Sequence, residues 1–248
     1  MNSYGIDFVG DIENLQIGKY HYNHNGIDFM FNYKKNSQKT IIVFHAKVNT
    51  ADTIPVFHKH DYECESTNVL SFSDKLLEKY QFLNSTCFMD LPNENYHEKY
   101  KFIINFILKK VQTPINIFYG SCSGALPALY FGCVFNEIIL CTNAYIYYED
   151  LENLHNKRAG FDTNLFIYPV MEKILLEYTP KHIYLYFNKN DNITNAQNIK
   201  FIKYCNNIIP KKMTYKSFGS DWNKLCCNNF YFPENETFND VINNIKNL

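Results

Sequence analysis

The sequence predicts an α/β fold with a mostly parallel sheet and helices on both of its faces. After an N-terminal hairpin, short apolar runs alternate with amphipathic segments, an order typical of βαβ units. One apolar run leads directly into a helix through Gly-Ser-Cys-Ser-Gly. The chain has 248 residues, a length that one hydrophobic core can still serve, so we expect a single domain over residues 1–248.

The elements follow from local patterns. Residues 18–33 alternate apolar and polar side chains around Asn25-Gly26, the pair that favours a two-residue hairpin turn. Buried strands are expected at 40–45, 68–72, 115–120, 137–141, 182–187 and 213–218. Helices are expected after Ser73 or Asp74 as cap, and over 96–111, 124–135, 171–179, 194–207 and 237–247. Residues 144–180 fit the alternation poorly and are interpreted as a small cap or lid.

The composition excludes several classes of protein. Hydrophobic residues make up 46% and aromatic residues 17% of the chain, too much for a disordered protein. The net charge is −1 and Arg158 is the single arginine, so we expect no nucleic-acid partner. The eight cysteines form no CxxC pair, so we expect no metal site and reduced thiols. Without a signal peptide or an apolar segment of membrane-spanning length, the sequence predicts a cytoplasmic protein.

The segment from Ile117 to Gly132 has the form of a nucleophile elbow, in which a strained strand-to-helix turn lifts one side chain above the sheet. Cys122 occupies the nucleophile position, between Gly120 and Gly124. A thiolate at a helix N-terminus has a lowered pKa and is a strong nucleophile. Shifting the register by one would centre the motif on Ser123, but Ser121 would then replace the first glycine. A strand-helix turn without any chemistry is the other reading.

Candidate partners of Cys122 are assigned from their places after strands. The backbone N–H of Ser123 would point at a developing oxyanion, and the backbone of Ala46 or Lys47 is a candidate second donor. Asp191 follows a late strand and is the candidate acid, although an Asp there could equally cap the next helix. Ser121 and Tyr145 are expected to line the substrate site.

The general base is the open question. An α/β-hydrolase would place it after the last strand, near residues 217–224, but the last histidine of this chain is His182. Three alternatives remain: His45, His58 or His60 comes in from elsewhere, Asp221 serves directly, or the site does not perform this chemistry. A lone histidine at a strand end, as His45 is, is more often a hydrogen-bonded structural residue than a base.

A family resemblance rests on the segments FHAKVNT, PVFHKH, NVLSFSDKLLEKY, IFYGSCSGALPALYFG, CTNAYIYYEDL and FNKNDN, in that order. The chain resembles bacterial α/β-hydrolase-fold proteins of cell-surface polysaccharide biosynthesis, including capsule polysaccharide O-acetyltransferases, over about residues 38–220. The resemblance implies Cys122 as nucleophile, Asp191 as acid and Ser123 as oxyanion donor. This chain has cysteine where the family has serine, Ala125 for a second glycine, and no histidine near residues 219–221.

Two functions are predicted. The first is an acyltransferase or esterase that acts on a cell-surface glycan or its precursor through Cys122. No cofactor would be tightly bound, and acetyl-CoA is implied as the acyl donor by the resemblance. The second is a catalytically degenerate α/β-hydrolase that binds a glycan, or docks on polysaccharide biosynthesis proteins.

Overall fold

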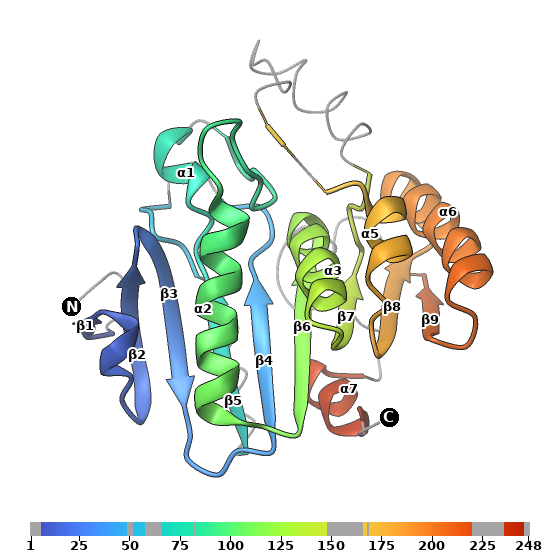
Figure 1. Cartoon of the computed structure of the whole chain (residues 1–248). Coiled ribbons are helices and arrows are strands. Elements are labelled where there is room, and N and C mark those ends of the chain that lie inside the picture. The colour runs from blue at the N-terminus through green and yellow to red at the C-terminus, as the bar shows by residue number, and fades with distance from the viewer. Residues whose placement is uncertain are drawn as a thin grey trace.

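The computed structural model describes residues 6–48, 52–57, 66–81, 83–147, 166–167, 169–219 and 236–245. The strands described form one sheet with the order β1-β2-β3-β5-β4-β6-β7-β8-β9 (Figure 1). From β5 to β9 every neighbouring pair is parallel, whereas β3 runs antiparallel to both β2 and β5. The strands are β1 (Phe8–Gly10), β2 (Gly18–His24), β3 (Ile27–Tyr33), β4 (Lys39–Phe44), β5 (Thr67–Phe72), β6 (Ile115–Ser121), β7 (Ile138–Thr142), β8 (His182–Asn188) and β9 (Met213–Phe218). The predicted mostly parallel sheet is confirmed.

The predicted N-terminal hairpin is formed by β2 and β3. Asn25 and Gly26 both have positive φ, 52° and 80°, as the two central residues of a type I′ turn require. Its twist matches that of the flanking strands, so His24 pairs directly with Ile27. The short strand β1 beside β2 was not predicted, because three half-exposed residues carry no clear alternation.

Along the sequence the helices alternate with the parallel strands, as predicted, and the last helix follows the last strand. They are α1 (Leu76–Lys79), α2 (Tyr96–Val111), α3 (Ala125–Val134), α5 (Met171–Glu177), α6 (Asn192–Ile208) and α7 (Phe238–Asn244), with 3-10 turns at Ile12–Asn14 and Cys122–Gly124. No helix in these parts of the chain is both long and apolar enough to cross a membrane.

Helix α1 lies within the periodic segment KLLEKY, residues 75–80, where a helix after Ser73 or Asp74 was predicted. The carboxylate of Asp74 accepts the Leu76 N–H at its start, but it also accepts the N–H groups of Thr86 and Phe88. The Asp74 side chain is fully buried, so these bonds replace water as its partners. They join the start of α1 to the segment that contains Thr86 and Phe88.

Helices cover both faces of the sheet, which confirms the predicted layers. Alternate residues of a strand face opposite sides, so neighbours in sequence belong to different cores. Ile42 and Phe118 belong to the large core under α2, α3, α5 and α6, the layer in front in Figure 1. Ile41 and Ile117 belong to the core on the other face, where Ile242 of α7 packs.

Of the expected cap over residues 144–180, residues 148–165 and 168 lie outside the described part of the chain. Near the C-terminal end of the expected cap, α5 buries Met171 and Leu175 and contacts α3 and α6. This helix therefore belongs to the front helical layer.

Candidate functional site

Cys122 is the first residue after β6, in a 3-10 turn that leads into α3. Its φ angle is +51°, in the left-handed region that a non-glycine residue seldom adopts. Such strain costs on the order of 1–3 kcal/mol and persists only where surrounding structure imposes it. The strained residue is Cys122 and not Ser123, so the geometry agrees with the register centred on the cysteine.

The two glycines of the turn are required by close backbone contacts. A Cβ on Gly120 would lie 1.9 Å from the carbonyl oxygen of Gly124. A Cβ on Gly124 would lie 2.3 Å from the carbonyl oxygen of Phe44 and 2.6 Å from that of His45. The start of α3 therefore packs directly on the carboxyl end of β4, and the elbow lies beside the loop that follows Phe44.

Cys122 differs in exposure from the other cysteines that the structure describes. It is partly exposed, whereas Cys87, Cys133, Cys141 and Cys205 are buried. Burial raises the pKa of Cys205 to about 12 and holds the pKa of Cys87, Cys133 and Cys141 well above the usual range of a thiol. Among these five thiols, Cys122 is thus the one that a reagent or substrate can reach.

The serines on either side of Cys122 are buried. In the described structure the hydroxyls of Ser121 and Ser123 have no hydrogen-bond partner, and neither does that of Thr142, which pairs with Ser121 across β6 and β7. Unpaired buried hydroxyls are costly and mark places where a polar ligand can bind. Ser121 and Ser123 therefore remain candidates for substrate contact.

His45 is held by hydrogen bonds at both ring nitrogens. Its Nε2 accepts the backbone N–H of Asp74 (3.1 Å), so the proton is on Nδ1, which donates to the carbonyl of Ala46 (2.7 Å). The ring is buried and packs on Phe88. This arrangement gives His45 the structural role, and it argues against the role of general base that the sequence left open.

The loop after β4 is held by a backbone hydrogen bond at Val48 and by its contact with Gly124. The backbone N–H of Val48 donates to the carbonyl of Asn84 (2.8 Å), so Val48 is not an oxyanion donor. Ala46 and Lys47 remain the candidates. The contact of Gly124 with the Phe44 and His45 carbonyls places this loop next to Cys122.

Because His45 is buried, we expect the protein to lose stability in mild acid. Burial lowers the pKa of this imidazole, although the nearby Asp74 carboxylate opposes the shift. The unfolded chain therefore binds more protons, and the free energy of unfolding falls as the pH drops below about 6.5, by up to about 1.4 kcal/mol per pH unit until the folded-state pKa is reached. Urea unfolding at pH 7.5 and 5.5 measures this. The His45→Gln variant should lose less than the wild type, and equal losses would contradict the assignment.

Asp191 lies in the turn after β8, where the acid was predicted, and it is buried. One carboxylate oxygen accepts the backbone N–H of Thr194 (3.2 Å) in the first turn of α6. Asp191 thus caps the helix, as the alternative interpretation expected, and its carboxylate is held at the carboxyl edge of the sheet. The candidates Asp221, His58 and His60 lie outside the described residues.

A block of hydrogen bonds joins the elbow to α6. The backbone N–H of Tyr145 donates to the carbonyl of Cys122 (3.0 Å), and the next two N–H groups donate to Oε1 of Gln197. The side chain of Asn198 donates to the carbonyl of Ala144 (3.2 Å). Gln197 and Asn198 were not predicted as part of the site, because polar residues on an amphipathic helix resemble a solvated face.

The other histidines that the structure describes lie away from the elbow or are paired. His182 begins β8, so it is at the opposite edge of the sheet. The two histidines of β2 are four strands from β6, roughly 19 Å at ordinary strand spacing. His97 has Nδ1 3.0 Å from the Asp90 carboxylate and Nε2 2.9 Å from the Phe88 carbonyl oxygen.

Known structures provide the comparison, since no protein-family model and no curated protein sequence matches the chain. The capsule O-acetyltransferase of Neisseria meningitidis serogroup A is 19% identical, with a TM-score of 0.64 over 85% of this chain and 90% of that one. A histidine-to-alanine variant of that enzyme in complex with CoA gives a TM-score of 0.61 at 17% identity, over 85% and 91%. A Pyrococcus furiosus esterase gives 0.56 at 11% identity, over 89% and 90%. Together with the strand order, these similarities establish that the chain has an α/β-hydrolase fold.

Proposed function

We propose that the protein transfers or cleaves acyl groups on a cell-surface glycan or its precursor, with Cys122 as the nucleophile. The observation that carries this proposal is the elbow itself. Cys122 is strained at φ +51°, partly exposed, and set between a buried strand and a helix N-terminus. The structural similarity to an O-acetyltransferase and to an esterase supports acyl chemistry on this fold.

The proposed reaction proceeds through a thioester on Cys122. The Sγ thiolate attacks the acyl carbonyl carbon, and the oxyanion is held by the N–H groups of Ser123 and of Ala46 or Lys47. The carbon–oxygen or carbon–sulfur bond to the donor then breaks, and the leaving group takes a proton. A glycan hydroxyl attacks the thioester in transfer, or water attacks it in cleavage, and either step regenerates the thiolate.

Asp191 is proposed to orient the group that moves the protons. It is buried at the carboxyl edge of the sheet, after β8, on the same hydrogen-bonded block as the elbow. Because both ring nitrogens of His45 are engaged, the candidate bases are His58, His60 and Asp221. The acyl donor is proposed to be acetyl-CoA, supported by the CoA complex of the similar O-acetyltransferase variant.

A binding protein with a degenerate triad is the second candidate. The observation in its favour is the state of His45, which is hydrogen-bonded at both ring nitrogens to backbone groups and not to Cys122. In this function the aromatic residues near the elbow, Tyr145 among them, would hold a glycan or a partner of a polysaccharide biosynthesis complex.

Alkylation separates the two candidates. Iodoacetamide should modify Cys122 in the folded protein, whereas Cys87, Cys133, Cys141 and Cys205 should react only after denaturation. The measurement is peptide mass spectrometry alongside the release of p-nitrophenol from p-nitrophenyl acetate. If the protein is an enzyme, release stops in proportion to the modification of Cys122. Undiminished release from protein fully alkylated at Cys122 would contradict the mechanism, and glycan binding without any release would favour the second candidate.

A further inference from the structure

The backbone carbonyl of Cys122 is held by two hydrogen bonds. It accepts the N–H of Ala125, at the start of α3, and the N–H of Tyr145 (3.0 Å), in the segment that follows β7. A carbonyl oxygen has two lone pairs, so these bonds use its full capacity. They fix the direction of the carbonyl in a residue whose φ of +51° is strained.

The same peptide unit carries the N–H of Ser123, the proposed oxyanion donor. The peptide bond between Cys122 and Ser123 is trans and planar, so its C=O and N–H point in opposite directions and turn together. The bond from Tyr145 to the carbonyl therefore also sets the direction of this N–H. An oxyanion donor stabilises the transition state when it is aimed at the position that the oxyanion will occupy.

Two amide side chains of α6 anchor the segment that follows β7. Oε1 of Gln197 accepts the N–H groups of Ile146 (2.8 Å) and Tyr147 (3.1 Å). The side chain of Asn198 donates to the carbonyl of Ala144 (3.2 Å). Gln197 is 3% exposed and Asn198 is fully buried, so water cannot replace these bonds when they break. The residue between these anchors donates to the elbow and is thus held from both sides.

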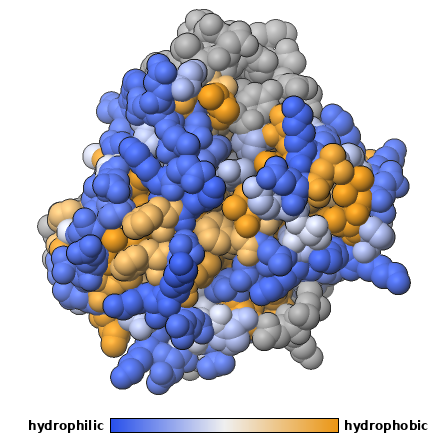
Figure 2. Space-filling view, in the orientation of Figure 1, coloured by the Kyte–Doolittle hydropathy of each residue, from blue (hydrophilic) through white to orange (hydrophobic). Residues whose placement is uncertain are grey.

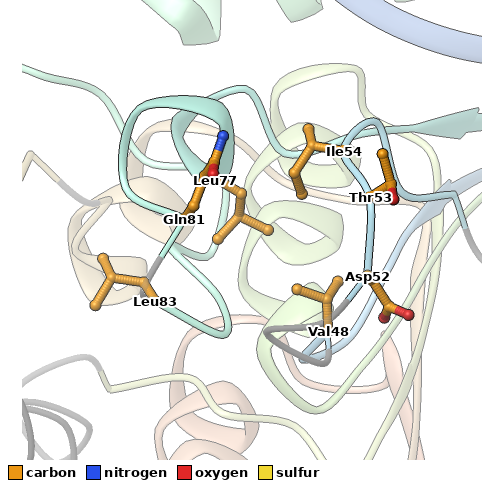
Figure 3. Close-up of a pocket in the computed structure, with 7 residues that line it drawn as sticks. All are labelled: Val48, Asp52, Thr53, Ile54, Leu77, Gln81 and Leu83. Carbon is orange, nitrogen blue, oxygen red and sulfur yellow. The ribbon is translucent and has the colours of Figure 1, made fainter.

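The loop after β4, on the other side of β6, borders a cavity of about 290 Å³ (Figure 3). Figure 3 shows Leu77 on one side of this cavity and Val48 and Ile54 on the other. Side chains at a cavity lack contact atoms on one side, so packing restrains them less. We therefore expect the segment after β7, which is hydrogen-bonded at consecutive residues, to determine how firmly the elbow is held.

We propose that Gln197 is a positioning residue for the Ser123 oxyanion donor, an inference that rests on the proposed function. Its Oε1 keeps the segment after β7 in place. The N–H of Tyr145 then holds the Cys122 carbonyl, and that carbonyl aims the Ser123 N–H. Without Oε1, two buried N–H groups lose their acceptor, and the segment must shift to pair them. The peptide unit after Cys122 can then rotate, and the donor no longer points at the oxyanion.

Gln197→Met tests this, because it removes the acceptor while it keeps about the same side-chain volume. The rate of p-nitrophenol release per folded molecule should fall about 10- to 100-fold, less than for the loss of a whole oxyanion donor. Gln197→Glu keeps an acceptor oxygen and replaces Nε2, which has no hydrogen-bond partner in the described structure. Its rate should stay within about threefold of the wild-type rate.

Asn68→Leu is the matched control, because it removes another buried amide that accepts a backbone N–H. Asn68 is 1% exposed near the start of β5, at the opposite edge of the sheet from the elbow, and its Oδ1 accepts the N–H of Lys34 (2.8 Å). Gln197→Met and Asn68→Leu should both unfold at a lower urea concentration than the wild type. Asn68→Leu should nevertheless release p-nitrophenol at the wild-type rate per folded molecule, with the folded fraction measured by circular dichroism.

Amide hydrogen exchange measured by NMR tests the positioning without any turnover. In the wild type, the N–H groups of Tyr145, Ile146 and Tyr147 should open together, with one common free energy of opening. In Gln197→Met the N–H of Tyr145 should exchange about tenfold faster or more, although Gln197 does not bond to it. In Gln197→Glu its exchange should match that of the wild type. The wild-type measurement stays decisive if Gln197→Met does not fold.

Three results would overturn the inference: a Tyr145 N–H that opens independently of Ile146 and Tyr147 in the wild type, a folded Gln197→Met protein with wild-type turnover, or lost turnover with unchanged exchange at Tyr145. Hydrolysis by the wild type reports on the proposed function separately. If the wild type releases no p-nitrophenol but exchange at Tyr145 depends on Gln197, the acyl chemistry fails and the positioning of the Cys122 carbonyl stands. If the wild type and Gln197→Met hydrolyse the ester equally well, the positioning role fails alone.

Discussion

Replacing Cys122 by alanine should lower the release of p-nitrophenol from p-nitrophenyl acetate by about 10³-fold or more. The expected size follows from removing the atom that forms the covalent intermediate, after which only binding and the oxyanion donors remain. The same variant should lose the acetyl-enzyme that mass spectrometry detects on the wild type. Cys122→Ser keeps a nucleophile of lower intrinsic reactivity, so we expect its rate to lie between those of the wild type and the alanine variant.

Cys205→Ala is the control for this prediction, because it removes a buried thiol of α6 that is not part of the proposed site. Its turnover per folded molecule should match that of the wild type. Circular dichroism and the unfolding midpoint show whether each variant is folded. A folded Cys122→Ala protein that retains turnover within threefold of the wild type would rule out the thioester route.

Much of the fold could be predicted because its elements are locally determined. The turn at Asn25-Gly26 needs two residues that tolerate positive φ, and the sequence supplies both. Helix α2 occupies the predicted residues 96–111, since Asn95 caps its start and the chain leaves the helix before Pro114. The hydrogen bonds from Thr86 and Phe88 to the Asp74 carboxylate could not be predicted, because these partners are 12 and 14 residues away in the sequence.

The candidate site could be predicted only in part. The elbow is contained in consecutive residues, so its spacing reveals Cys122 and both glycines. The role of His45 could not be predicted in this way. Its Nε2 accepts a hydrogen bond from the backbone N–H of Asp74, which follows a different strand. Gln197 likewise acts on backbone groups some fifty residues away. Such pairings depend on tertiary packing, which neither periodicity nor spacing encodes.

The surface shows a similar limit of sequence patterns. Phe102 is 52% exposed on α2, and Leu176 of α5 is 69% exposed. Figure 2 shows apolar side chains gathered over α2 and, at the right, over α5 and α6, on an otherwise hydrophilic face. The amphipathic pattern places a helix against the core, but it does not tell which apolar residues remain outside the contact.

Replacing Gly124 by alanine should lower the free energy of unfolding by about 3 kcal/mol or more. The new Cβ would lie 2.3 Å from the Phe44 carbonyl oxygen, 2.6 Å from that of His45 and 2.9 Å from the Phe44 carbonyl carbon. All three atoms are backbone, so no side-chain rotation relieves the overlap. Helix α3 must instead move away from β4, which separates Cys122 from the loop of the oxyanion donors.

Gly219→Ala is the matched control for Gly124→Ala, because its Cβ would meet the flexible Lys189 side chain 2.9 Å away, and we expect a cost below about 0.5 kcal/mol. Urea unfolding followed by circular dichroism measures the stability and the folded fraction of both variants, and ester hydrolysis at low urea measures the turnover of the folded protein. Gly124→Ala should lose turnover even where it is folded, because the nucleophile and the oxyanion donors no longer lie in register. A loss of less than 1 kcal/mol with full turnover would mean that α3 does not start against the end of β4, and the elbow geometry on which the proposed chemistry depends would be wrong.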